Sequence, residues 1–368
     1  MAGDVRLHRE DFGDLPGWRE DDHAAAFVAL RRSAFRSLEK PYRTGSLGID
    51  QAAFGPAFAA ARQQEGSGPA AARAFFEHHF LPFRIEVGGR PTGLVTGFYE
   101  PVADASPVPT DGFRYPLYRR PDDLVDVDDA NRPATLDPYF AFGRRTDAGG
   151  IVEYFDRGEI ERGALSGRGL EFAWLADPVD VFFIHVQGAA RLAMPDGAER
   201  RVTYAAKSGH PFTGAGRVLI EKGELPADGV TMQSIRAWFK EHPDRVDEIL
   251  WRNRSFIFFR DALVDDPELG PVAAAKVPLT PGRSMAVDRL IHTFGTPFFV
   301  DAPALTSFGG VPFRRLMIAQ DTGSAIVGAA RGDLFAGSGF AAGEIAGVVR
   351  NEATFHILVP APIAERFT

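Results

Sequence analysis

The chain has 368 residues, which is enough for two compact domains that each bury a hydrophobic core. Hydrophobic residues make up 45% of it and charged residues 24%, a composition typical of globular proteins. The net charge of −8 argues against binding to nucleic acid through the phosphates, because such binding needs a cationic surface. The chain has no Cys, which excludes disulfide bonds, thiol catalysis and cysteine ligands for a metal.

The sequence has no segment typical of membrane targeting or membrane spanning. Its first residues include no apolar stretch of the kind found in signal peptides. No run reaches the ~18 consecutive apolar residues that a membrane helix needs. Two interpretations stay open at this point: the protein is cytoplasmic, or a leader has been removed before residue 1.

The first hundred residues are predicted to form helices and then strands. The expected elements are helices at about 22–38 and 70–79 and strands at about 83–87 and 93–100. Asp21 and Asp22 can cap the first helix, in which apolar residues recur at helical spacing. Gly88 and Gly89 between the two strands favour a hairpin turn.

Residues from about 101 to 255 are expected to consist of short segments joined by Pro-rich loops. The best candidate for a strand is 180–187, where apolar residues occupy both faces. A Pro-Asp-Gly turn at 195–197 precedes a strand that begins at Arg201. One helix is expected at about 231–241, and a shorter helix follows around Ile249.

Strands return after this middle region. They are expected at about 256–259, 284–287, 297–300, 315–319 and 354–359. This distribution favours a mainly β fold with some α, in which 1–100 and 256–368 form a β-barrel and 101–255 are inserted as a smaller β-rich domain. A groove between the two domains is the expected ligand site.

The densest run of residues that could perform chemistry lies near the C-terminus. An apolar strand leads to Asp321 and a Thr-Gly turn, a small apolar strand follows, and Asp333 comes next with glycines nearby. A carboxyl at the end of a buried strand is poorly solvated, which raises its pKa and keeps it protonated closer to neutral pH. In an isolated Asp-Thr-Gly, however, the commoner role of the Asp is that of a turn residue whose carboxylate bonds its own backbone.

Asp-Thr-Gly at 321–323 also occurs in aspartic proteases, whose catalytic pair needs two such carboxylates that share a proton. This chain has one Asp-Thr-Gly and no Asp-Ser-Gly. A dimeric protease could supply the second copy, but such chains are far shorter and would not explain the middle domain.

Polar residues at other predicted strand ends are candidates for ligand contacts. Gln187 and Gly188 follow one such strand, and Tyr99 and Glu100 end another. His185 has apolar neighbours and is expected to be a hydrogen-bonded core residue rather than a catalyst. The remaining histidines lack metal-binding spacing and no nucleotide-binding motif is present, so neither a metal nor another cofactor is expected.

Several segments, in one order along most of the chain, resemble the MltA family of membrane-bound lytic murein transglycosylases. They are Leu-Pro-Gly-Trp-Arg-Glu-Asp-Asp-His at 15–23, Thr-Gly-Phe-Tyr-Glu-Pro at 96–101, the run from 177 to 188, Gly-His-Pro-Phe-Thr at 209–213 and Val-Pro-Leu-Thr-Pro-Gly-Arg-Ser at 277–284. Two C-terminal segments, at 319–323 and 331–339, resemble the three-aspartate domain of that family.

The resemblance implies a double-psi β-barrel made from both ends of the chain, with a smaller β-rich domain inserted. It also implies cleavage of peptidoglycan between N-acetylmuramic acid and N-acetylglucosamine, which leaves a 1,6-anhydromuramic end and takes up no water. The catalytic aspartate of the family falls on Asp321 and another motif aspartate on Asp333. Asp301 is the expected third, with a poorer match.

One carboxyl can be enough for this reaction, because the C6 hydroxyl of the substrate is the nucleophile. An ordinary glycosidase uses a second carboxylate as nucleophile or as base for water. Asp321 is expected to protonate the leaving oxygen and then to accept the proton of the C6 hydroxyl. Tethering of the nucleophile replaces part of what a second catalytic group would supply.

Glycan binding needs flat apolar surfaces and polar groups with fixed geometry. The residues expected to contact the glycan are Phe98, Tyr99, Glu100, Gln187, Gly188, Arg283, Asp301, Thr322 and Gly323. Arg283 in particular is expected to meet a lactyl or stem-peptide carboxylate. The chain departs from the family pattern at Ser324, Ala189 and Ala190, so sugar contacts there are expected to differ.

A competing interpretation is a peptidoglycan-binding protein on the same fold that performs no catalysis. In either case the resemblance implies the periplasm or cell envelope, and it predicts that the full-length gene encodes a leader that this chain lacks. Glycan strands are the expected partner, and the cell-wall machinery of the envelope is a further one. The membrane would be reached only through a lipid anchor outside this chain, and no nucleic acid is expected.

Overall fold

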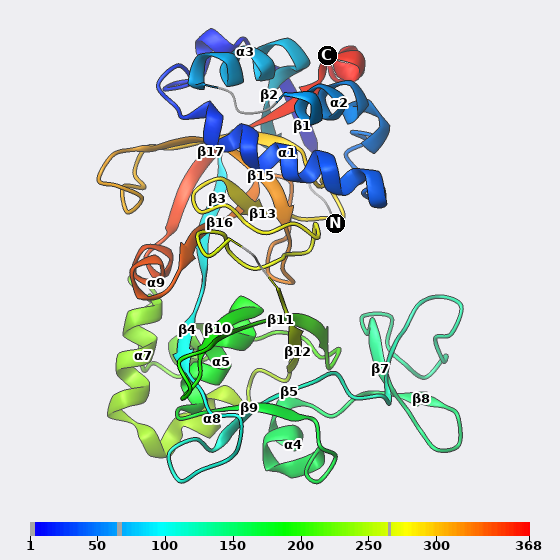
Figure 1. Ribbon diagram of the computed structural model, residues 1–368, viewed down its shortest axis with the longest axis vertical. Helices are drawn as coiled ribbons and strands as arrows, with labels where there is room; N and C mark the ends of the chain where they lie inside the picture. The colour runs from blue at the N-terminus through cyan, green and yellow to red at the C-terminus, as the bar shows by residue number, and fades with distance from the viewer. Residues whose placement is uncertain (1–3, 65–67, 264–265) are drawn as a thin grey trace. The chain divides into compact units, whose positions relative to one another are not determined.

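The computed structural model describes residues 4–64, 68–263 and 266–368, which divide into two compact units (Figure 1). The first unit takes the chain up to Tyr99 and again after residue 263. The second unit is Glu100–Leu263. Among the described residues, no helix has both the length and the apolar character needed to cross a membrane.

An eight-stranded sheet forms the centre of the first unit. Its strands are β1 (Val5–Arg9), β2 (Phe80–Val87), β3 (Gly93–Glu100), β13 (Ser284–Ala286), β14 (Pro297–Ala302), β15 (Phe313–Asp321), β16 (Arg331–Ser338) and β17 (Arg350–Pro360). They are hydrogen-bonded in the order β1-β2-β17-β14-β15-β13-β16-β3. Because β17 also pairs with β3, the strands from β17 to β3 in this order form a closed ring.

Helices cover this sheet and close its core. They are α1 (His23–Glu39), α2 (Gly55–Gln63), α3 (Pro69–His79) and α9 (Phe340–Gly347), with 3₁₀ segments η1 (Phe12–Asp14), η2 (Gln51–Phe54) and η5 (Ala361–Phe367). The carboxylate of Asp22 caps α1 by accepting the Ala25 N–H at 3.2 Å. Phe27 and Leu30 then face a core shared with the sheet. The N-terminal helix α1 thereby packs against β15, a strand from the C-terminal part of the chain.

The predicted elements of this unit are confirmed except near two turns. Gly88 and Gly89 do form a tight turn with positive φ, but the strands before and after it diverge to different places in the sheet. The prediction of a small apolar strand after Asp321 is wrong, because residues 322–330 form turns and irregular backbone. In that loop Ser324 is exposed to solvent.

The second unit combines three small sheets with short helices. Its strands are β4 (Val102–Asp104), β5 (Tyr115–Tyr118), β6 (Leu124–Asp126), β7 (Phe142–Arg145), β8 (Ile151–Val152), β9 (Glu171–Leu175), β10 (Ala189–Ala193), β11 (Glu199–Lys207) and β12 (Ile257–Asp261). Its helices are α4 (Arg157–Glu159), the π-helical η3 (Ile160–Ala164), α5 (Pro178–Gln187), α6 (Ala215–Glu221), α7 (Met232–Glu241), η4 (Pro243–Arg245) and α8 (Val246–Leu250). The strand expected at 256–259 appears as β12, but it pairs with β11 and so belongs to this unit.

The strand predicted at 180–187 is wrong, because this segment is the helix α5. Asp177 caps the helix by accepting the Val179 N–H at 2.8 Å, and Pro178 occupies the first turn. Gly188 ends it in the left-handed conformation, with φ of 74°. The residues from Val179 to His185 are buried except Asp180, so the apolar pattern has no helical period and looks like that of a buried strand.

Candidate active site

Asp321 and Asp333 lie on either side of the short strand β13. Ala286 of β13 is the register partner of Asp321 in the parallel β13–β15 pair and of Asp333 in the antiparallel β13–β16 pair. Neighbouring strands are about 4.8 Å apart, so the Cα atoms of the two aspartates are about 10 Å apart across Ala286. The small side chain at this position leaves room between the two carboxyl groups.

Backbone groups hold the carboxyl of Asp321 in place. The N–H of Ala274 donates to its Oδ1 at 3.1 Å, and the N–H of Thr322 also bonds the carboxyl. The main chain on either side is fixed as well, since Val287 N–H donates to the Asp321 carbonyl at 2.9 Å. Ala275 N–H donates to the carbonyl of Gln320 at 3.0 Å. Asp321 is therefore held between β13 and the turn at 273–276.

Burial raises the pKa of Asp321 to about 6, and the negative charge of Asp333 acts in the same direction. The N–H donors of Thr322 and Ala274 and the charge of Lys276 oppose this rise in pKa. The apolar surroundings include a cluster of Phe98, Leu279, Ala286, Ile326 and Phe335. Part of Asp321 nevertheless remains exposed to solvent. The carboxyl can thus hold a proton close to neutral pH on a residue that is only half-buried.

Asp333 accepts a hydrogen bond from a short polar chain. The Thr96 hydroxyl of β3 donates to Asp333 Oδ1 at 2.5 Å and accepts from Arg331 Nη2 at 2.6 Å. Burial raises the pKa of Asp333, while the charge of Arg331 and the Thr96 hydrogen bond lower it. The effect of burial is the larger, so the pKa of Asp333 is raised, and the two polar contacts limit that rise.

The third carboxylate that the structure brings to this place is Asp288 and not Asp301. Asp288 follows Val287 directly, and its Oδ2 accepts the N–H of Gly328 at 2.9 Å, which fixes the loop after Asp321. Asp301, by contrast, forms an ion pair with Arg314 at 3.0 Å. Arg314 is about 23 Å from Asp321 along β15, at about 3.3 Å per residue. The signal for Asp288 in the sequence is its position two residues after β13.

Comparison with known proteins decides the family. Residues 94–260 match the model of the MltA specific insert domain, and residues 283–359 match that of the 3D domain. A crystal structure of a membrane-bound lytic murein transglycosylase from Agrobacterium tumefaciens is 54% identical to this chain. Its match covers 99% of this chain and 100% of the other, with a TM-score of 0.93. This chain belongs to the MltA family.

More distant relatives carry the same family name. Membrane-bound lytic murein transglycosylase A of Escherichia coli K12 is 33% identical over 273 residues, which are 73% of this chain and 66% of that protein. The match thus spans just under two thirds of the E. coli protein. A crystal structure of MltA from Neisseria gonorrhoeae is 32% identical and covers 98% of this chain and 95% of the other, with a TM-score of 0.79. The MltA family is therefore shown by full-length matches as well as by partial ones.

The structure assigns two predicted sugar contacts of this MltA protein to its interior. Phe98 packs against Phe335, with ring centroids 5.3 Å apart, and is 8% exposed. The ring of Tyr99 is buried against Gly343 of α9, where a Cβ would lie 2.9 Å from the ring. These aromatic groups hence shape the apolar surroundings of the acids instead of presenting open faces. Thr322 and Gly323 lie in the loop directly after Asp321 and remain at least partly exposed.

Arg283 is also placed differently from the prediction. Its guanidinium forms two hydrogen bonds of 2.8 Å to the carboxylate of Asp21 and a third, of 3.1 Å, to the carbonyl of Leu316. The side chains of Arg283 and Asp21 are 8% and 3% exposed. The expected contact with a substrate carboxylate is corrected accordingly, because the donors of this arginine are used within the fold.

Three other predicted contacts belong to the second unit. Glu100 is fully buried and accepts a hydrogen bond from Arg191 Nε at 2.8 Å, so it forms an internal ion pair. Gln187 and Gly188 lie at the end of α5, where Gly188 N–H bonds the carbonyl of Ile184. They were expected at the end of a strand, and the structure instead places them at the end of a helix.

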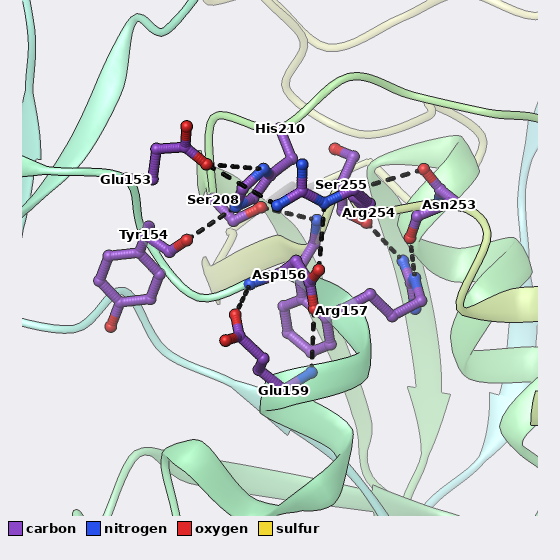
Figure 2. Close-up of polar contacts among 11 residues, drawn as sticks. Glu153, Tyr154, Asp156, Arg157, Glu159, Ser208, His210, Asn253, Arg254 and Ser255 are labelled. Carbon is purple, nitrogen blue, oxygen red and sulfur yellow. Dashed lines mark hydrogen bonds and ion pairs between the residues drawn. The ribbon is translucent and has the colours of Figure 1, made fainter. Parts of the chain in front are cut away.

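A polar cluster that could not be predicted from the sequence lies in the second unit (Figure 2). Arg157 is fully buried there and donates to the carbonyl oxygens of Asn253 at 3.2 Å and Ser255 at 2.9 Å. Its Nη2 also lies 3.0 Å from His185 Nδ1, which confirms His185 as a hydrogen-bonded core residue. His210, of the predicted Gly-His-Pro-Phe-Thr segment, bonds the carbonyl of Tyr154 at 2.7 Å. The hydrogen bonds of this cluster connect residues 154–157 with His210 and with residues 253–255.

Among the described residues, no group of three or more His, Asp or Glu side chains is arranged to hold a metal ion. The site does contain two carboxyl groups that interact electrostatically, Asp321 and Asp333. One of them has a pKa of about 6, and the other is hydrogen-bonded as an acceptor. This arrangement suits proton transfer to a leaving oxygen.

Replacing Asp333 with Asn is expected to move the pH dependence of activity to lower pH. The carboxylate raises the pKa of Asp321, so its loss lowers that pKa and leaves less protonated Asp321 at pH 7. A fall of one pKa unit would reduce the protonated fraction at pH 7 by about tenfold. The measurement is the pH profile of kcat/KM, with Asp50→Asn on the surface as a control. If the high-pH limb of this profile were unchanged in Asp333→Asn, the electrostatic coupling between Asp333 and Asp321 would be contradicted.

Proposed function

We propose that this protein is a lytic transglycosylase that cleaves the β-1,4 bond between N-acetylmuramic acid and N-acetylglucosamine in peptidoglycan. The supporting observation is Asp321, a half-buried residue at the end of β15 whose carboxyl has a pKa of about 6. Membership of the MltA family and the 54% identity to an Agrobacterium transglycosylase support the same activity. A solved E. coli MltA contains bound chitohexaose, which supports a glycan strand as the ligand here.

Asp321 would act first as acid and then as base. It gives its proton to the bridging oxygen as the bond from C1 to that oxygen breaks, and positive charge develops at C1. The C6 hydroxyl of the same muramic residue then attacks C1, and its proton returns to the Asp321 carboxylate. The product is a 1,6-anhydro ring, and the enzyme regains its starting state without using water.

Asp333 would assist through its charge. The hydroxyl of Thr96 and the guanidinium of Arg331 favour its ionised form. A negative charge here keeps Asp321 protonated before the reaction. The same charge stabilises the positive C1 centre as the bond breaks.

Mass analysis of products from purified sacculi tests this proposal. A lytic transglycosylase releases muropeptides that are lighter by one water than those from hydrolysis. Sedimentation with sacculi and no release would instead indicate a binding protein without activity. Products that contain the added water would indicate a hydrolase, and either result would overturn the proposal.

We also propose that the closed ring of strands is a double-psi β-barrel and that the protein acts in the periplasm. The barrel is supported by the pairing of β17 with β3, which closes the ring, and by the parallel pair β13–β15 within it. Curated relatives are described as membrane-bound, which supports a location in the cell envelope. Fractionation of cells that express the full-length gene tests the location.

A further inference from the structure

The turn at 273–276 lies directly against Asp321. Its Ala274 N–H bonds the carboxyl of Asp321, and its Ala275 N–H bonds the carbonyl of Gln320. The turn closes on itself through Ala273 N–H to the carbonyl of Val277 at 3.1 Å. These bonds fix the position of every residue in the turn relative to the reacting carboxyl.

Lys276 has an unusual backbone conformation in this turn. Among the described residues it is the single non-glycine with a left-handed φ, which is 61°. An L side chain rarely adopts this conformation, and it does so at a cost in energy that glycine avoids. Lys276 is exposed. Lysine is also uncommon here, with five in the sequence against 36 arginines. A strained and exposed lysine beside a catalytic carboxyl points to a role for its ammonium group.

The proposed substrate carries carboxylates that an ammonium group can bind. Each muramic residue carries a lactyl group, whose carboxylate is free in denuded strands and is amide-linked to a peptide in stem-bearing strands. The stem peptide has carboxylates of its own. Arg283, the cation expected to bind such a group, is bound to Asp21 instead. The charge of Lys276 is close enough to Asp321 to lower the pKa of that carboxyl.

We propose that Lys276 is a specificity-determining residue that binds a carboxylate of the muramic residue and so places its glycosidic bond at Asp321. The inference rests on the proposed transglycosylase function. Lys276 lies in the same turn as Ala274, whose N–H bonds the reacting carboxyl. Binding of the substituent and positioning of the acid are thereby joined in one short segment.

The test compares kcat/KM on three substrates: denuded glycan strands, the same strands with their carboxylates converted to neutral methylamides, and stem-bearing strands. A charge-assisted contact is worth about 10- to 100-fold in binding. The wild-type protein is therefore expected to prefer charged over neutralised strands by about that factor. In Lys276→Gln and Lys276→Gly the preference should fall to about one, mainly through KM. Lys40→Gln, at an exposed lysine of the same unit, should keep it.

The two Lys276 variants distinguish the effect of losing the ammonium group from any effect on the conformation of the turn. Glycine adopts the left-handed conformation without strain, so Lys276→Gly should be at least as stable as the wild-type protein in thermal unfolding. Loss of the preference on denuded strands assigns the lactyl carboxylate, and loss confined to stem-bearing strands assigns the peptide. Equal losses on all three substrates would overturn the proposal and leave the transglycosylase function standing. No cleavage of any strand by the wild-type protein would refute that function itself.

Discussion

Asp321→Ala and Asp321→Asn are expected to reduce the cleavage of glycan strands by about 10²–10⁴-fold, the range that a positioned general acid and base contributes. Neither variant has a proton of suitable acidity to give to the leaving oxygen. Asn keeps the shape and an oxygen that can accept the Ala274 N–H, so the turn at 273–276 should stay in place. The measurement is release of anhydro-muropeptides from sacculi per unit time.

The pH dependence of the wild-type protein follows from the same carboxyl. With a pKa of about 6, Asp321 loses its proton as the pH rises through that value. Activity should therefore decline above about pH 6, by roughly tenfold for each further pH unit in the limit. An upper limb that lies several units higher would show that another group provides the proton.

Protein stability provides the control for the Asp321 variants. The pKa of Asp321 is raised in the folded state, so the folded protein holds the protonated form more tightly than the unfolded chain does. This contribution is complete below the unfolded pKa of about 4 and is lost as the pH rises through about 6. Asp321→Asn carries no charge to desolvate, so it should melt at a higher temperature than the wild-type protein at pH 8. Cleavage retained by this stable variant would refute Asp321 as the acid.

The strand that leads to Asp321 could be predicted from the sequence, because the cause is local. An apolar run at 315–320 predicts a buried strand, and the end of such a strand predicts a poorly solvated carboxyl. The structure has both, as β15 and a raised pKa. The helix α1 could be predicted for the same reason, since its cap at Asp22 and its apolar spacing lie within one short segment.

Features that depend on distant partners could not be predicted in this way. The choice between Asp288 and Asp301 depends on register, which places Ala286 beside both Asp321 and Asp333 and places Asp301 beside Arg314. The helix α5 was missed for another reason. A helix buried on nearly all sides loses its period, and the Asp-Pro start and Gly end were the signals that remained.

The ion pair between Arg283 and Asp21 is such a distant contact, and breaking it should be the largest single loss of stability in the first unit. Besides binding Arg283, Asp21 accepts the Leu316 N–H at 2.7 Å. The pair therefore joins the start of α1 to β15, the strand that ends at Asp321. Arg283→Met would leave a carboxylate that is 3% exposed without its cation. The expected cost is about 3–5 kcal/mol in the free energy of unfolding.

Denaturant unfolding of matched variants tests this expectation. In the double variant Asp21→Asn with Arg283→Met both charges are gone, so most of the loss should be recovered, because no unpaired charge remains buried. Arg314→Met breaks the pair with Asp301, where the arginine side chain is 38% exposed, and should cost less than about 1 kcal/mol. If Arg283→Met instead unfolded like the wild-type protein and raised only KM for charged strands, Arg283 would be a substrate contact after all. The carboxylate specificity assigned to Lys276 would then have to be shared between the two cations.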